Sequence, residues 1–208
     1  MRGAKLFVLF LSVFVIGSSF VAVPVTSEKS VNDFALKNID GKILSLKNYP
    51  AAKGFIIVFT CNHCPFAKLY AARLNELNSR FSRFNVPLIA VNSSDTVMFA
   101  DETIKGMAEM ARSKKINFPY LSDASQVVGQ NFQADKTPHA FVIWKEQNKW
   151  IVKYSGAIDD NGANAKDVKV PFVANALQEL LGGKPVSIPN GRSIGCAIHY
   201  RNGPRMAR

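Results

Sequence analysis

The sequence predicts a three-layer α/β domain with a central mixed sheet. Two runs rich in Ile, Val and Phe, at 54–60 and 86–91, are typical of strands buried on both faces. An amphipathic helical pattern at 65–81 separates them. Two strand-like segments around a turn near 146–148 then form a closing hairpin. This alternation favours one sheet with helices packed on its faces.

The remaining elements follow the same alternation. Residues 33–46 hold two alternating segments around Asp40-Gly41, which predicts an N-terminal hairpin. On the helix at 65–81, we expect Leu69, Ala72 and Leu77 to lie near one buried face. Further helices are expected at 103–116, 124–132 and 170–183, with a short extended piece at 118–123.

The N-terminus has the pattern of a secretory signal. Arg2 and Lys5 precede an apolar run and the small residues that follow it. We therefore expect a signal peptide at 1–22 and export to the periplasm or the exterior. If the segment stays uncleaved, it forms an N-terminal membrane anchor, and only then is a membrane a partner.

The mature chain is expected to form a single domain. The full sequence of 208 residues is 48% hydrophobic and 20% charged, a balance typical of a globular protein. We assign the domain to 28–183 and an irregular basic tail containing Cys196 to 184–208. The net charge of +11 comes from scattered residues, which indicates a solvated basic surface. No nucleic-acid partner is expected, because no basic helix with interleaved aromatic residues is present.

Two of the three cysteines occur in the segment F-T-C-N-H-C-P-F-A, as Cys61 and Cys64. A disulfide-stapled scaffold would contain more cysteines, and a bridge across so short a loop constrains the unfolded chain little. A zinc site would need a second close pair of ligands, whereas Cys196, His139 and His199 are dispersed. We expect no metal and no cofactor. A CxxC pair with one distant thiol favours a redox centre.

The position of the pair predicts the roles of its residues. Cys61 directly follows a buried strand and opens a helix, where unpaired backbone N–H groups and the helix dipole stabilise a thiolate. We therefore expect a lowered pKa at Cys61, which makes it the nucleophile. Cys64, one turn further on, closes the disulfide. Protonated His63 would stabilise the thiolate further and tune the redox potential.

The chain resembles the thioredoxin-fold redoxins. More narrowly, it resembles the peroxiredoxin-like branch of the alkyl hydroperoxide reductase and thiol-specific antioxidant family. The matching stretches are DFALKNIDGKILSL, IIVFTCNHCPFAK, VPLIAVNSSD, FPYLSDASQVVGQNFQADKTPHAFVI, YSGAIDD and IGCAIHY. The resemblance covers nearly the whole mature chain and implies a thioredoxin-like three-layer α/β/α fold.

The resemblance also implies roles for individual residues. Thr137 and Pro138 are expected to be joined by a cis peptide bond that faces the CxxC pair, and to form the substrate-docking edge. Cys61 would attack and Cys64 would resolve. Cys196 lies in a stretch that resembles a C-terminal motif of the branch. It is a candidate third redox thiol or a cap on the site, and an inert buried thiol remains the alternative.

These observations favour an exported thiol–disulfide oxidoreductase. Its partners would be protein or small-molecule thiols and disulfides, together with an unidentified redox partner. One alternative is a thiol peroxidase, but peroxidases of the superfamily place a threonine three residues before the reactive cysteine. Before Cys64 that position holds Cys61, and Thr60 lies one residue too early. The other alternative is a binding module with the same fold and no turnover.

Overall fold

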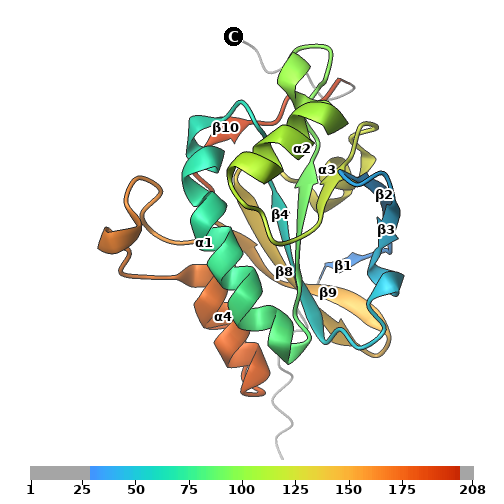
Figure 1. The fold of residues 1–208 in the computed structure, drawn as a ribbon. Helices are drawn as coiled ribbons and strands as arrows, with labels where there is room; N and C mark the ends of the chain where they lie inside the picture. Colours follow the sequence, from blue (N-terminus) through green and yellow to red (C-terminus); the bar gives the residue numbers. More distant parts are fainter. Residues whose placement is uncertain (1–28, 202–208) are drawn as a thin grey trace, which may run out of the picture.

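The computed structural model describes residues 29–201 (Figure 1). The expected signal peptide at 1–22 lies outside the described residues, as do the last residues of the tail. Among residues 29–201, no helix combines the length and the apolar character needed to cross a membrane.

An eight-stranded mixed sheet forms the centre of the domain. Its strands lie in the order β1-β9-β8-β4-β5-β6-β2-β3. They are β1 (Ser30–Val31), β2 (Ala35–Asn38), β3 (Ile43–Ser45), β4 (Gly54–Phe59), β5 (Leu88–Asn92), β6 (Tyr120–Ser122), β8 (His139–Glu146) and β9 (Lys149–Gly156). The β4-β5-β6 pairings are parallel and the others antiparallel. The hairpins expected at both ends of the domain, β2-β3 and β8-β9, are confirmed.

Helices cover both faces of this sheet, which confirms the three-layer α/β architecture. The helices are α1 (Pro65–Phe81), α2 (Ile104–Ser113), α3 (Val127–Phe132) and α4 (Phe172–Leu181). Side chains of α1, α2 and α4 share one core cluster with Ile56 and Val58 of β4. Side chains of α3 pack with Ile57 and Phe59 on the opposite face. Every residue of β4 is buried, as expected for a central strand.

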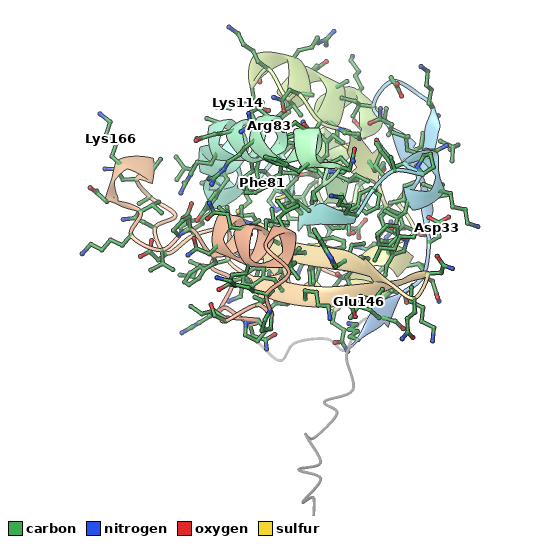
Figure 2. The ribbon with its side chains drawn as sticks, turned by 90° about the horizontal axis from the view of Figure 1, so that it is seen from below. Asp33, Phe81, Arg83, Lys114, Glu146 and Lys166 are labelled. Carbon is green, nitrogen blue, oxygen red and sulfur yellow. The ribbon has the colours of Figure 1, made fainter. Side chains whose placement is uncertain are left out.

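The buried face of α1 differs from the expected one. Leu69 is 51% exposed and Ala72 is also exposed, so only Leu77 of the three expected residues is buried. The buried stripe includes Tyr70, Leu74 and Phe81 instead. This stripe follows the helical spacing of three to four residues, and the aromatic residues at 70 and 81 continue it. Figure 2 shows Phe81 between the helices and the sheet.

The tail expected to be irregular contains a short strand that packs on the domain. β10 (Cys196–Ala197) pairs antiparallel with β7 (Lys136–Thr137). The Ile198 amide donates to the Asp135 carbonyl at 2.9 Å, and the Tyr200 hydroxyl donates to the Ala134 carbonyl at 2.7 Å. Residues 193–201 are therefore held against the loop that precedes Pro138.

The corrected face of α1 can be tested with two substitutions of the same chemistry. Leu74→Ala should lower the free energy of unfolding by about 2–5 kcal/mol, because it leaves a cavity in the core. Leu69→Ala, on the same helix, should change it by about 0.5 kcal/mol or less. Urea unfolding measures both values. A larger loss for Leu69→Ala than for Leu74→Ala would contradict the assigned face.

Candidate active site

Cys61 and Cys64 lie in the loop between β4 and α1. The strand ends at Phe59 and the helix begins at Pro65, so Cys64 is the N-cap residue, with extended φ and ψ of −72° and 119°. The CxxC pair therefore precedes the helix. The sequence had led us to expect that Cys61 opens the helix and that the pair forms its first turn. Both cysteines are buried, Cys64 completely.

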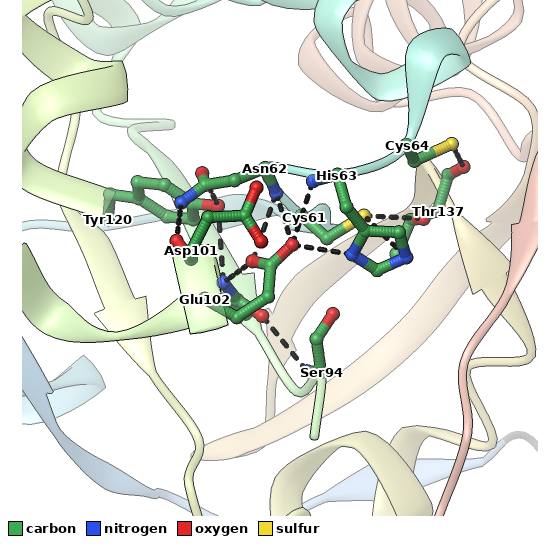
Figure 3. Close-up of polar contacts among 10 residues, drawn as sticks. Cys61, Asn62, His63, Cys64, Ser94, Asp101, Glu102, Tyr120 and Thr137 are labelled. Atoms are coloured by element: carbon green, nitrogen blue, oxygen red, sulfur yellow. Dashed lines mark hydrogen bonds and ion pairs between the residues drawn. The ribbon is translucent and has the colours of Figure 1, made fainter. Parts of the chain in front are cut away.

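Thr137 contacts the pair from the opposite side. Its hydroxyl oxygen lies 3.1 Å from the Cys61 Sγ, and its carbonyl oxygen lies 3.1 Å from the Cys64 Sγ (Figure 3). The peptide bond to Pro138 is cis, which confirms the expectation from the resemblance. Cys196 lies opposite Thr137 in the β7-β10 pairing, so the three cysteines of the chain gather around one residue.

The environment of Cys64 favours its thiolate. The pKa of Cys64 is lowered to about 4, first by the hydrogen bond from the Cys61 thiol and then by the Cys196 thiol and the amides of Ala67 and Cys196. Burial and the nearby Thr137 carbonyl oppose this effect. Ala67 occupies the third helical position, whose N–H is the group that an N-cap side chain ordinarily accepts from. Cys64 therefore receives the stabilisation that the sequence analysis assigned to Cys61.

The surroundings of Cys61 act against the low pKa expected for it. Its pKa is raised, first by the hydrogen bond to Cys64, then by burial and by the negative charge of Glu102, while Thr137 acts in the opposite direction. The physical reason is the position of the helix. Because α1 begins after Cys64, its free N–H groups point at the second cysteine of the pair.

A buried carboxylate, Glu102, organises the CxxC loop. It belongs to a short 3-10 turn, η3 (Ala100–Glu102), and is 1% exposed. Its oxygens accept the backbone N–H of Asn62 at 2.8 and 3.0 Å and that of His63 at 2.8 Å. The side-chain amide of Asn92 donates to it as well. Figure 3 shows these contacts converging on the Glu102 carboxylate.

The same carboxylate orients the His63 ring. His63 Nδ1 lies 2.6 Å from the Glu102 Oε1 and Nε2 lies 4.0 Å from the Cys61 Sγ. The ring stacks on Phe99, with centroids 3.8 Å apart and planes 6° apart. Because Glu102 accepts hydrogen bonds from all its other neighbours, we assign the Nδ1 proton to a bond with it. The lone pair of Nε2 then faces Cys61, which is the arrangement of a general base.

Sequence reasoning missed both Glu102 and Phe99. They lie in the stretch 92–102, for which the sequence had suggested no function. A signal was nevertheless present. β4 and β5 are parallel neighbours, so the residues that follow them emerge at the same edge of the sheet. An acidic pair, Asp101 and Glu102, in the connection after β5 could have been placed near Cys61 on that ground.

Among residues 29–201, Cys61, His63 and Glu102 form a group of side chains that could hold a metal ion. One ligand atom from each lies within 4.8 Å of the others. The Glu102 oxygens are, however, already engaged by N–H donors, so a cation would have to break the bonds that shape the loop. His139, which the sequence offered as another possible ligand, contacts Asp135 and Ser155 instead. The donor set suits a hydrogen-bonded thiol site better than a metal.

Comparison with known proteins supports the same fold. A model of the AhpC/TSA family matches residues 28–160. An uncharacterized conserved protein from Geobacillus kaustophilus is 30% identical, with 85% of this chain and 93% of that one covered and a TM-score of 0.77. A hypothetical protein from Sinorhizobium meliloti 1021 is 29% identical, with 86% and 97% covered and a TM-score of 0.77. No curated protein matches the chain.

More distant solved structures share the fold alone. Peroxidoxin BcpB from Mycobacterium tuberculosis is 17% identical, with 62% of this chain and 82% of that one covered and a TM-score of 0.51. A thiol-disulfide oxidoreductase from Bacteroides fragilis is 14% identical, with 61% and 89% covered and a TM-score of 0.51. The thioredoxin fold expected from the sequence is thereby confirmed.

The assignment of the thiolate predicts a measurable titration. Reduced protein should show the ultraviolet absorbance of one thiolate at neutral pH, and this absorbance should disappear only near pH 4. The Cys64→Ser variant should lack it. Retention of the low-pH transition in Cys64→Ser, together with its loss in Cys61→Ser, would show that Cys61 holds the thiolate.

Proposed function

Because the chain belongs to the AhpC/TSA family, we propose that it is a thiol–disulfide oxidoreductase whose redox centre is the Cys61–Cys64 pair. The observation that carries the proposal is the geometry of the pair: Cys64 lies at the N-cap of α1, and Thr137, at the cis peptide bond, contacts both sulfurs. The pKa of Cys64 is lowered in this arrangement, and that of Cys61 is raised. One thiol is ionised and ready to attack, and the other keeps its proton until a disulfide forms. The signal-like N-terminus favours action outside the cytoplasm.

In the first step, the Cys64 thiolate attacks one sulfur of a substrate disulfide. A Cys64–substrate bond forms, the substrate S–S bond breaks, and the second substrate sulfur leaves as a thiolate. This order reverses the roles expected from the resemblance, because the stabilised thiolate is at Cys64. The attack by Cys64 requires the residues that cover it to move, since Cys64 has no exposed surface.

In the second step, Cys61 attacks Cys64 and releases the reduced substrate. Cys61 must first lose its proton, and His63 Nε2, 4.0 Å from the Cys61 Sγ, can accept it. A Cys61–Cys64 disulfide forms, the mixed disulfide breaks, and the leaving thiolate takes a proton. Two electrons pass from the dithiol to the substrate disulfide. The reverse sequence oxidises a substrate dithiol.

The surroundings favour a polypeptide substrate. Large apolar side chains that remain exposed adjoin the site in sequence: Phe66 lies next to Pro65, Met98 precedes Phe99, and Ile194 lies two residues before Cys196. Exposed apolar groups around a reactive centre are typical of a protein-binding surface. We propose protein thiols and disulfides as the principal partners, docked along the edge of Thr137.

The proposed roles predict which variant traps a substrate. The double variant Cys61→Ser/Cys196→Ser should accumulate a mixed disulfide at Cys64 when the reduced protein reacts with a disulfide, because no other thiol of the chain is left to resolve it. Cys64→Ser should form mixed disulfides far more slowly and should not turn over. Mass spectrometry after an acid quench measures both products. Rapid trapping at Cys61 in Cys64→Ser, with none at Cys64 in Cys61→Ser/Cys196→Ser, would sink the assigned order.

The role of Glu102 predicts a defect that is largest in the second step. Glu102→Gln keeps the shape of the side chain but removes the charge that orients His63 and an acceptor for the loop amides. We expect resolution of the mixed disulfide to slow by roughly ten- to a hundredfold, and the first attack to slow less. Glu109→Gln, an exposed position on α2, serves as the matched control. Rapid-quench measurement of the two steps and their pH profiles distinguishes this result from a general loss of structure.

Thiol peroxidase activity is a second candidate, and the low pKa of Cys64 favours it. A peroxide would oxidise the Cys64 thiolate to a sulfenic acid and release water or an alcohol, and Cys61 would then condense with it to form the disulfide and water. A peroxide-consumption assay on the same preparations compares the two candidates. Reaction with peroxide much faster than with disulfides would favour the peroxidase.

A further inference from the structure

We propose that Cys196 is a second disulfide partner of Cys64, so that the oxidised protein exists in two forms. One form contains the Cys61–Cys64 disulfide. The other contains a Cys64–Cys196 disulfide, which ties residues 193–201 over the site. The proposal rests on the dithiol chemistry proposed above and adds a third thiol that closes the site.

The geometry around Thr137 brings Cys196 to Cys64. Cys196 is paired with Thr137 across the β7-β10 ladder, where opposite Cα atoms lie about 4.5–5.5 Å apart. The carbonyl oxygen of that same Thr137 lies 3.1 Å from the Cys64 Sγ. Cys196 packs against the cluster of Cys61, Cys64 and Ala67. Cys64 and Cys196 lie close enough for each to shift the pKa of the other, and a disulfide requires Cα atoms within about 7 Å.

Several bonds on both sides of Cys196 hold it in this place. Ser193 Oγ donates to the Asp135 carboxylate at 3.1 Å, and the Ile198 amide donates to the Asp135 carbonyl at 2.9 Å. At Gly195 no side chain would fit, because a Cβ would collide with the Thr137 carbonyl. The glycine therefore allows the backbone to lie directly on the edge of Thr137. The bonds and this close fit fix Cys196 beside Cys64.

The chemistry of the exchange is balanced without an added reductant. Cys196 attacks Cys64 within the Cys61–Cys64 disulfide, a Cys64–Cys196 bond forms, and Cys61 leaves with the proton that Cys196 gives up. In the reduced protein, burial and the neighbouring Cys64 raise the pKa of Cys196 to about 11. Oxidation of Cys64 removes its negative charge, so Cys196 then loses its proton more easily.

The two oxidised forms differ in what they expose. When Cys64 is bonded to Cys61, the covering segment is attached by noncovalent contacts and can be displaced by a substrate. When Cys64 is bonded to Cys196, the segment is fastened covalently and the Thr137 edge is occupied by β10. The second form stores the oxidised state in a molecule that cannot dock a substrate.

The test uses the full-length protein without Cys61. Reduced Cys61→Ser is treated with oxidised glutathione, quenched in acid, alkylated and mapped by peptide mass spectrometry. We expect an intramolecular Cys64–Cys196 disulfide as the main product, with release of two glutathione molecules. The double variant Cys61→Ser/Cys196→Ser should instead retain glutathione on Cys64. Circular dichroism confirms that both variants are folded.

The proposal would be overturned if Cys61→Ser forms no Cys64–Cys196 disulfide after treatment with both oxidised glutathione and diamide. If the variants fail to fold, the wild-type protein equilibrated with oxidised glutathione is mapped, and absence of this linkage there has the same meaning. These outcomes are separate from the proposed function, which fails only if wild-type protein neither forms a Cys61–Cys64 disulfide nor turns over a disulfide substrate.

Discussion

The buried carboxylate of Glu102 determines the conformation of the loop that carries the dithiol. A charge buried this deeply would cost several kcal/mol without partners. Its partners are the backbone amides of Asn62 and His63 and the imidazole of His63. Satisfying the charge therefore bends the CxxC loop before α1 begins. The same negative charge helps raise the pKa of Cys61, so one residue shapes the backbone and affects which thiol keeps its proton.

Cys64 becomes the central thiol because it ends the loop and begins the helix. Its pKa is lowered first by the Cys61 thiol, then by the Cys196 thiol and by the amides of Ala67 and Cys196. The two thiols among these partners also take part in the proposed chemistry. Cys61 supplies the resolving sulfur, and Cys196 supplies the cover. The asymmetry of the pair thus follows from where α1 starts, at Pro65.

The sequence was sufficient for the elements but not for the contacts that define the site. Apolar runs predicted β4 and β5, and the bounds of α1 matched at both ends, because buried strands and long amphipathic helices have strong local patterns. The sequence analysis placed Cys61 at the start of the helix, whereas Cys64 is the N-cap residue. Glu102 was missed because it meets His63 across 39 residues, and no local period records such a contact. The resemblance suggested Cys196 as a redox thiol or a cap, without identifying its neighbour.

The docking edge and the third thiol compete for the same residue. Thr137 offers its backbone to a substrate in the proposed function, but in the described structure its partner across the ladder is Cys196. A substrate strand must therefore replace β10 before its disulfide can reach Cys64. β10 is only two residues long, so few ladder bonds oppose this exchange. The cover is consequently held chiefly by contacts outside the ladder, such as those of Asp135. Access to the thiolate depends on how easily these contacts release, and a bond from Cys196 to Cys64 would prevent that release.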